Sequence, residues 1–168
     1  MIEMRIVGVR VEMPNQQPIL MLTEATGTRS LPILIGSAEA TAIAMHLQGV
    51  RPPRPLTHDL FRDTLSALGR TLTEIRVVDF REGTFYGELV FDNDTTVSAR
   101  PSDAVALAVR CEVPVYVAEA VLDEAGIVIA EEAEADEPEA IADPEGEVER
   151  FREFLDSVSP EDFGPETQ

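Results

Sequence analysis

The stretch R-P-P-R-P-L-T-H-D, residues 51–59, separates two segments whose apolar residues recur at helical spacing. Its three prolines each fix φ and remove a backbone donor, so the connection is stiff. The pattern before it predicts a helix over 39–48 that ends at Gly49. The pattern after it predicts a helix from Thr57, as N-cap, to Gly69. One face of this second helix carries Leu60, Phe61, Thr64, Leu65 and Leu68.

Strand-like segments lie on both sides of this pair of helices. Strands are predicted over 2–13, 19–23 and 31–35, the first with a bulge where its alternation slips. Strands at 71–80 and 84–91 are joined by a hairpin at 81–83, and short strands follow at 95–99 and 115–117. A third helix begins at Pro101, and 118–125 forms a short one. The order predicts an α+β fold, a mixed, largely antiparallel sheet packed with three main helices.

The formal charge of −19 is concentrated at one end of the chain. Residues 130–168 contain 15 acids and 2 arginines, a net charge of −13. We therefore predict a domain over 1–129 and an acidic tail over 130–168. The tail is predicted to be mostly disordered, with a short amphipathic helix at 147–158. It is interpreted as a solvated appendage; the alternative is an autoinhibitory segment that competes with polyanions for Arg51 and Arg54.

Composition narrows the class of protein. Overall acidity argues against a general nucleic-acid coat protein, although a nuclease with a locally positive site remains compatible with it. The single cysteine, Cys111, allows no intrachain disulfide and is predicted to be a buried core thiol. Because no signal peptide and no apolar segment of about 18 residues is visible, we expect a cytoplasmic protein without membrane spans.

Four segments carry a family resemblance: L-P-I-L-I-G-S-A-E-A (31–40), R-P-L-T-H-D-L (54–60), G-T-F-Y-G-E-L (83–89) and A-R-P-S-D-A-V-A-L-A (99–108). In this order they resemble the bifunctional nuclease (BFN) domain family, over roughly residues 1–130. The resemblance implies a nuclease that acts on DNA, RNA or both. With the edges that a small sheet must cover, it also implies a homo-oligomer, a dimer being favoured. Gly87 departs from the family pattern, which usually has alanine there.

Phosphodiester hydrolysis requires an activated water, stabilisation of charge on the phosphorus centre, and assistance to the leaving oxygen. The resembling segments supply residues of these types. We predict catalytic roles for Glu39, His58, Asp59 and Asp103, and phosphate binding by Arg51, Arg54 and Arg100. A divalent metal, Mg²⁺ or Mn²⁺, is predicted to bind Glu39 and Asp103.

Structural alternatives stand beside each of these predictions. Glu39, Asp59 and Asp103 all fall in the predicted first turn of a helix, where the helix dipole stabilises acids by about 0.3–1 kcal/mol. Asp103 could close a capping box around Arg100, and the arginines could simply form ion pairs. His58 is either a neutral proton acceptor or metal ligand, or a local hydrogen-bonding group.

Two further features have a bland interpretation that we prefer. His46 lies seven residues after Glu39, so a shared metal is geometrically conceivable, but a partly exposed helix histidine is favoured. Phe85 and Tyr86 should point to opposite faces of a strand, one toward the core and the other free to stack a base. The alternative to a nuclease is a non-catalytic regulatory or ligand-binding module on the same fold.

Overall fold

The computed structural model describes residues 1–128, so the predicted acidic tail and its helix at 147–158 lie outside the described part. Seven strands form one sheet in the order β3-β2-β1-β7-β4-β5-β6. The strands are β1 (Ile2–Glu12), β2 (Gln17–Glu24), β3 (Ser30–Leu34), β4 (Leu72–Arg81), β5 (Thr84–Phe91), β6 (Thr96–Ala99) and β7 (Val115–Val117). Every neighbouring pair is antiparallel except β4 and β7, which are parallel. The predicted mixed, largely antiparallel sheet is confirmed.

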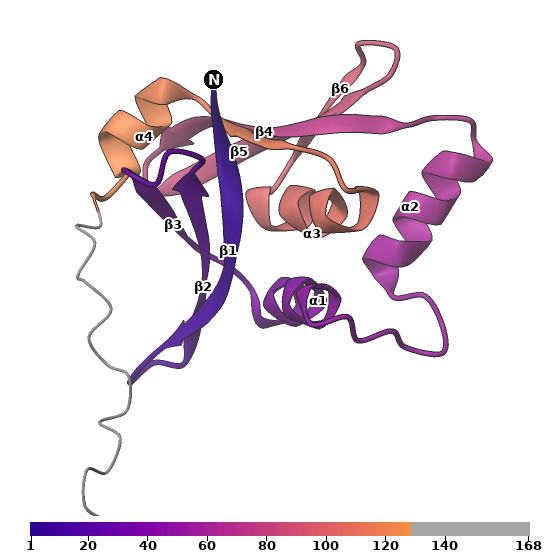
Figure 1. Cartoon of the computed structure of the whole chain (residues 1–168), viewed down its shortest axis with the longest axis horizontal. Helices are drawn as coiled ribbons and strands as arrows, with labels where there is room; N and C mark the ends of the chain where they lie inside the picture. The colour runs from indigo at the N-terminus through magenta and orange to yellow at the C-terminus, as the bar shows by residue number, and fades with distance from the viewer. Residues whose placement is uncertain (129–168) are drawn as a thin grey trace, which may run out of the picture. The chain divides into compact units, whose positions relative to one another are not determined.

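Four helices accompany this sheet: α1 (Ser37–Leu47), α2 (Thr57–Ala67), α3 (Pro101–Cys111) and α4 (Glu119–Ala125). α1 packs on β1 and β2, α3 packs on β4 and β5, and these two helices pack on each other (Figure 1). α4 contacts β3 and β4. The predicted α+β fold with three main helices and one short helix is confirmed.

Local sequence signals explain the irregular points of the sheet. The β1–β2 register shifts between Ile6 and Gly8, which confirms the predicted bulge, and Gly8 has a φ of 146°. The β4–β5 hairpin turns through Glu82 and Gly83, both with positive φ, the geometry of a two-residue turn that matches strand twist.

The core lies between the sheet and the two packed helices. Its fully buried members come from both halves of the sheet and from α1, α3 and α4: Leu20, Leu22, Leu31, Ile43, Ile75, Val77, Val105, Val117 and Leu122. α3 is the most deeply buried helix, because Ala104, Val105 and Ala106 are all inaccessible to solvent. The start of α3 is therefore held rigidly against the sheet.

α2 is attached differently from α1 and α3. Within residues 1–128 it has no buried residue, and its packing partner is α3. Leu60, Phe61 and Leu68 of its predicted apolar face are exposed, and only Leu65 of that face packs against the core. The predicted N-cap at Thr57 is wrong by one residue. Leu56 is the N-cap, and its N–H donates to the carboxylate of Asp59 at 3.0 Å.

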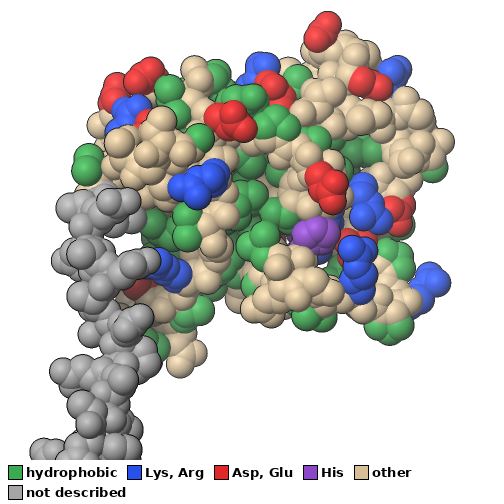
Figure 2. Space-filling model, in the orientation of Figure 1, with side chains coloured by type: hydrophobic (Ala, Val, Ile, Leu, Met, Phe, Trp, Pro, Cys, Tyr) green, Lys and Arg blue, Asp and Glu red, His purple; other side chains and the backbone are tan. Residues whose placement is uncertain are grey.

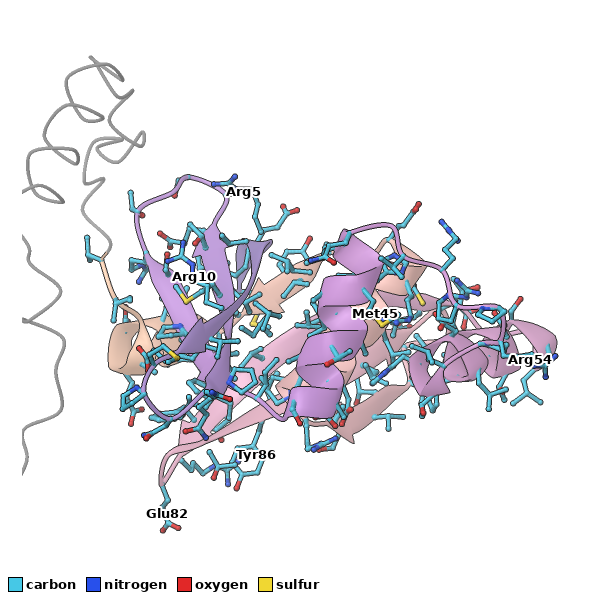
Figure 3. All side chains as sticks on the ribbon, turned by 90° about the horizontal axis from the view of Figure 1, so that it is seen from below. Arg5, Arg10, Met45, Arg54, Glu82 and Tyr86 are labelled. Atoms are coloured by element: carbon cyan, nitrogen blue, oxygen red, sulfur yellow. The ribbon has the colours of Figure 1, made fainter. Side chains whose placement is uncertain are left out.

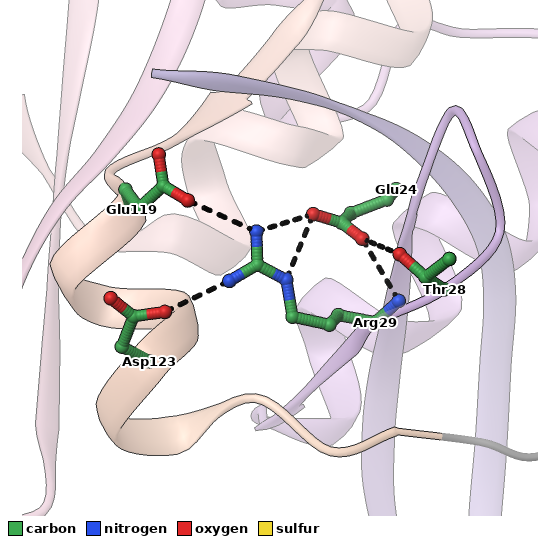
Figure 4. A network of polar contacts seen from close by, with 5 residues as sticks. All are labelled: Glu24, Thr28, Arg29, Glu119 and Asp123. Carbon is green, nitrogen blue, oxygen red and sulfur yellow. Dashed lines mark hydrogen bonds and ion pairs between the residues drawn. The ribbon is translucent and has the colours of Figure 1, made fainter.

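A buried carboxylate ties the β2–β3 turn to α4. Glu24 accepts hydrogen bonds from the Thr28 hydroxyl, from the Arg29 N–H, and from Arg29 Nε and Nη2 at 2.9 and 2.6 Å (Figure 4). The hydrogen bonds from Arg29 and Thr28 lower the pKa of Glu24. Arg29 also donates to Asp123 and Glu119 of α4 at 2.9 and 3.3 Å. One guanidinium thus fixes the short helix on the turn.

Candidate functional site

The first turns of α1, α2 and α3 share one sequence feature. Each has an acid at its third helical position: Glu39, Asp59 and Asp103. Within the described chain, the N-cap residues of these helices, Gly36, Leu56 and Arg100, make no side-chain capping hydrogen bond. The positive ends of three helix dipoles are therefore left to these acids and to solvent.

Arg100 joins two of these acids. Its Nη2 donates to Glu39 Oε1 at 2.8 Å and its Nε donates to Asp103 Oδ2 at 2.7 Å. These hydrogen bonds, the one to Asp103 first, raise the pKa of Arg100 further above its ordinary value. Asp103 does not close the capping box that was considered for it; its carboxylate binds the side chain of Arg100 instead. The ion-pair alternative considered for the arginines thus applies to Arg100, which pairs with both Asp103 and Glu39.

His58 completes this group from α2. Its Nε2 lies 3.2 Å from Asp103 Oδ1. An ionised carboxylate only accepts hydrogen bonds, so Nε2 carries the hydrogen and Nδ1 of a neutral ring keeps its lone pair. The imidazole is oriented by Asp103 and can accept a proton at Nδ1.

These residues line an open cavity of about 580 Å³ between the starts of the three helices. The side chains of Glu39 and His58 are each 15% exposed, that of Asp103 is 32% exposed and that of Arg100 is 65% exposed. The imidazole is thus shielded while the guanidinium faces solvent. The structure brings together Glu39, His58, Arg100 and Asp103, four of the seven predicted site residues.

Gly36 leaves space for the Glu39 carboxylate and was not anticipated as a site residue. It is the N-cap of α1, and a Cβ built on it would lie 2.3 Å from Glu39 Oε2. The absence of a side chain lets the carboxylate fold back over the helix start toward Arg100. A glycine directly before a helix with an acid three positions later is the sequence signal for this arrangement.

Asp59 is turned away from this cavity. Its Oδ1 accepts a hydrogen bond from Arg110 Nε at 2.6 Å, and the Arg110 side chain is only 2% exposed. Burial alone raises the pKa of Asp59, but the hydrogen bonds from Arg110 and the Leu56 N–H lower it, and the net direction is downward. Arg110 also donates to the carbonyls of Ala106 and Ala42, so it connects α3, α1 and α2. Asp59 and Arg110 therefore form a structural ion pair.

Arg51 and Arg54 also lie away from Arg100. Both line a second cavity of about 210 Å³ with His46, Asp59, Arg62 and Arg110. The predicted phosphate-binding set is therefore divided between two cavities. His46 belongs to this second cavity and is partly buried, so the structure does not place it with Glu39. Burial, followed by the nearby cations Arg110 and Arg51, lowers the pKa of His46.

Phe85 and Cys111 pack against the hydrophobic core, and Tyr86 lies at the surface. Phe85 packs against Phe80 with ring centroids 4.4 Å apart, while Tyr86 is 40% exposed under the Arg81 guanidinium. This confirms opposite faces for Phe85 and Tyr86.

Cys111 is partly buried against the core rather than fully buried, and burial raises its pKa, which disfavours a reactive thiolate.

The predicted metal ligands Glu39 and Asp103 are joined through the side chain of Arg100 in this structure. Their oxygens suit Mg²⁺ or Mn²⁺ chemically. However, the Arg100 guanidinium bridges the two carboxylates. Over residues 1–128, no group of three or more His, Cys, Asp or Glu side chains is placed to hold a metal ion. A cation between these carboxylates would require Arg100 to move.

Arg110 is the residue that sequence reasoning missed most clearly. It stands in the apolar run A-V-A-L-A-V-R-C of the third helix, and a lone arginine in such a run signals a buried and paired cation. Its partner, 51 residues away in sequence, gives no local sign.

Comparisons with known proteins agree with the motif pattern. The model of the bifunctional nuclease domain matches residues 20–130. An uncharacterized protein of Mycobacterium tuberculosis is 60% identical over 161 residues, 96% of this chain and 97% of that protein. Bifunctional nuclease 2 of Arabidopsis thaliana is 30% identical over 115 residues, 62% of this chain and 35% of the plant protein. Bifunctional nuclease 1 of Oryza sativa subsp. japonica is 24% identical over 119 residues, 67% of this chain and 36% of the plant protein. The chain spans about a third of these plant proteins.

Proposed function

Because the chain belongs to the bifunctional nuclease domain family, we propose that it hydrolyses phosphodiester bonds of DNA or RNA in the cavity between α1, α2 and α3. The observation that carries this proposal is the chain of contacts Glu39–Arg100–Asp103–His58. It combines an oriented imidazole, a fixed guanidinium and the free N–H groups of helix starts around one opening.

In this proposal His58 moves the proton. Its Nδ1 takes a proton from the attacking water, whose oxygen forms the new bond to phosphorus. The bond from phosphorus to the leaving oxygen then breaks, and the imidazolium returns its proton to that oxygen. Asp103 is a positioning residue, because it holds the ring through Nε2 and stabilises the imidazolium.

Arg100 receives the negative charge of the phosphate in this scheme. Its Nε donates to Asp103 and its Nη2 donates to Glu39, and because the side chain is 65% exposed, its remaining N–H groups are available to a phosphate. The two carboxylates outnumber the guanidinium by one charge. The approach of a phosphate is therefore supported by the positive ends of the helix dipoles as well as by Arg100.

The test is cleavage of labelled single- and double-stranded DNA and RNA by wild type, His58→Gln and Asp103→Asn, in Mg²⁺, Mn²⁺ or chelator. General acid–base catalysis predicts a loss of about 10²–10⁴-fold in kcat for His58→Gln. Asp63→Asn is the matched control, because it removes an exposed acid of α2 outside the cavity. Equal cleavage by His58→Gln and wild type would contradict the assignment. Absence of cleavage in wild type with intact folding would favour the non-catalytic binding module.

A divalent ion bound by Glu39 and Asp103 stays part of the proposal as a prediction. The comparison of Mg²⁺, Mn²⁺ and chelator tests this prediction through activity.

We also propose that the protein is a homodimer and that it acts in the cytoplasm. The exposed Leu60, Phe61 and Leu68 on α2 support a homodimer that covers this face. Light scattering on wild type and Phe61→Asp tests it, since a dimer held by this face should dissociate in the variant.

The helices within residues 1–128 are all too short or too polar to cross a membrane. The single cysteine supports action in the reducing cytoplasm.

A further inference from the structure

The cavity beside α2 concentrates arginine in an otherwise acidic protein. Arg51, Arg54, Arg62 and Arg110 line its roughly 210 Å³ together with His46. Figure 2 shows basic and acidic side chains beside a histidine on this face of the molecule. By contrast, the whole chain carries a formal charge of −19. A cluster of arginines in such an acidic chain suggests that the cavity binds an anion.

Two of these arginines are already neutralised. Arg110 is paired with Asp59 at 2.6 Å, and Arg62 is paired with Asp63 at 2.7 Å. Arg51 and Arg54 have no hydrogen-bond or ion-pair partner among residues 1–128. Asp59 is the acid that lines the cavity, and it is occupied by Arg110 and the Leu56 N–H. Among residues 1–128, the charges of Arg51 and Arg54 are therefore not paired within the cavity.

Prolines restrict the backbone that carries these two arginines. Pro52 directly follows Arg51 and Pro55 directly follows Arg54 on the stiff linker between α1 and α2, and both prolines also line the cavity. Figure 3 shows Arg54 at the α2 end of the molecule. The lowered pKa of His46, caused by burial and then by Arg110 and Arg51, is consistent with a positive potential in the cavity.

We propose that this cavity binds a phosphate group through Arg51 and Arg54, at a site separate from the cluster of Glu39, His58, Arg100 and Asp103. Guanidinium groups bind phosphate oxygens in a bidentate manner, and a cavity of this size accepts a single phosphate rather than a large ligand.

The two sites are neighbours, which suggests the source of the phosphate. Pro55 and Leu56 line both cavities, so the linker forms the wall between them. A nucleic-acid strand with its scissile bond at Arg100 would present a flanking phosphate on the other side of this wall. This source rests on the proposed nuclease function; a free phosphate or a phosphomonoester offers the same chemistry without it.

The two histidines of the chain allow each cavity to be followed separately. His46 reports on the arginine cavity and His58 on the cluster around Asp103. In a titration of the full chain with inorganic phosphate at constant ionic strength, followed by NMR of the histidine rings, we expect a saturable shift of His46 and a rise of its pKa. Substitution of each histidine assigns the two signals.

Matched variants test whether Arg51 and Arg54 cause the phosphate response of His46. Arg51→Gln/Arg54→Gln should weaken the phosphate response of His46 by about tenfold or more, the value of one or two charge-assisted hydrogen bonds. Arg5→Gln/Arg10→Gln removes the same charge from β1, whose labelled arginines lie on the opposite side of Figure 3 from Arg54, and should leave the response intact. An unresponsive His46 in wild type, or an equal loss in both double variants, would overturn the proposal.

Substrate length distinguishes the two sources. For a flanking phosphate, Arg51→Gln/Arg54→Gln should raise the KM of a single-stranded pentanucleotide about tenfold more than the KM of bis(p-nitrophenyl) phosphate. The slope of log affinity against log salt should also become shallower by about 0.7 for each phosphate that the variant no longer binds. If the His46 response disappears and both substrates are affected equally, the site belongs to free phosphate or a phosphomonoester. If wild type cleaves neither substrate, the proposed function fails, and the His46 response still decides the phosphate site.

Discussion

His58 and Asp59 are consecutive residues of α2, yet their side chains serve opposite sides of its first turn. His58 Nε2 lies 3.2 Å from Asp103 Oδ1, whereas Asp59 Oδ1 accepts a hydrogen bond from Arg110 Nε at 2.6 Å. The Arg110 side chain is 2% exposed, and Asp59 is 18% exposed. One turn of helix therefore supplies one group to the candidate site and one group to the ion pair that links α1, α2 and α3.

We predict that Asp59→Ala lowers the free energy of unfolding by about 3 kcal/mol, because it leaves the buried Arg110 without its counter-charge. Urea denaturation measures this change. Asp63→Ala on the same helix is the control and should cost less than about 1 kcal/mol, since its pair with Arg62 is exposed. Similar losses for the two variants would contradict a structural role for Asp59.

The dependence of stability on pH should carry the signature of the same ion pair. The pKa of Asp59 is lower in the folded protein than in the unfolded chain, where an aspartate titrates near 3.9. Its contribution to stability is therefore complete above about pH 4 and is lost as the pH falls through the lower, folded pKa. Denaturation curves between pH 6 and 2 should show a smaller loss of stability in Asp59→Asn than in wild type. Parallel curves for the two proteins would count against the pairing.

Gly36→Ala should change the site without unfolding the protein. The backbone of Gly36, with φ of −72° and ψ of 153°, accommodates alanine, but the new Cβ would lie 2.3 Å from Glu39 Oε2. The carboxylate must then move, and Arg100 loses one of its two anchors. We expect kcat/KM to fall by about tenfold, the value of one charge-assisted hydrogen bond, with little change in melting temperature.

A double-mutant cycle identifies the route of this effect. If Gly36→Ala acts through Glu39, then Gly36→Ala combined with Glu39→Gln should be no worse than Glu39→Gln alone. Additive losses in kcat/KM would show that the new methyl group acts elsewhere.

Removal of the Arg100 guanidinium should strengthen cation binding between Glu39 and Asp103. In wild type this guanidinium bridges both carboxylates, so a divalent ion must displace it. We expect Mn²⁺ to broaden the NMR signals of His58 at lower concentration in Arg100→Gln than in wild type. Glu39→Gln/Asp103→Asn should abolish the broadening in either background. Mn²⁺ binding that ignores all of these substitutions would place the metal elsewhere.

Much of the fold was accessible to sequence reasoning because it is set by local patterns. Helix spacing, the proline at the start of α3 and the turn at Glu82 and Gly83 each determine structure within a few residues. The environment of α2 was not accessible in this way. Helical spacing groups Leu60, Phe61 and Leu68 on one face, but it does not reveal that this face lacks a covering element within residues 1–128.

The site was accessible only in part for a related reason. Residue type and motif position selected Glu39, His58, Arg100 and Asp103, which meet in one cavity. The same criteria could not separate Asp59 from this group, because its partner Arg110 comes from a helix 51 positions later. Long-range pairing determines which face of a helix start each acid occupies, and a local pattern does not contain it.

The position of β7 has a consequence for the order of assembly during synthesis. This three-residue strand lies between β1 and β4, and it joins the half of the sheet built from β1–β3 to the half built from β4–β6. Both halves leave the ribosome before β7 does. Because β7 pairs with both β1 and β4, we expect the two halves to join as one sheet only after residue 117 has emerged. A nascent chain stalled before that point lacks the strand that joins the two halves, so we expect the proposed site to assemble only in chains whose sheet has closed.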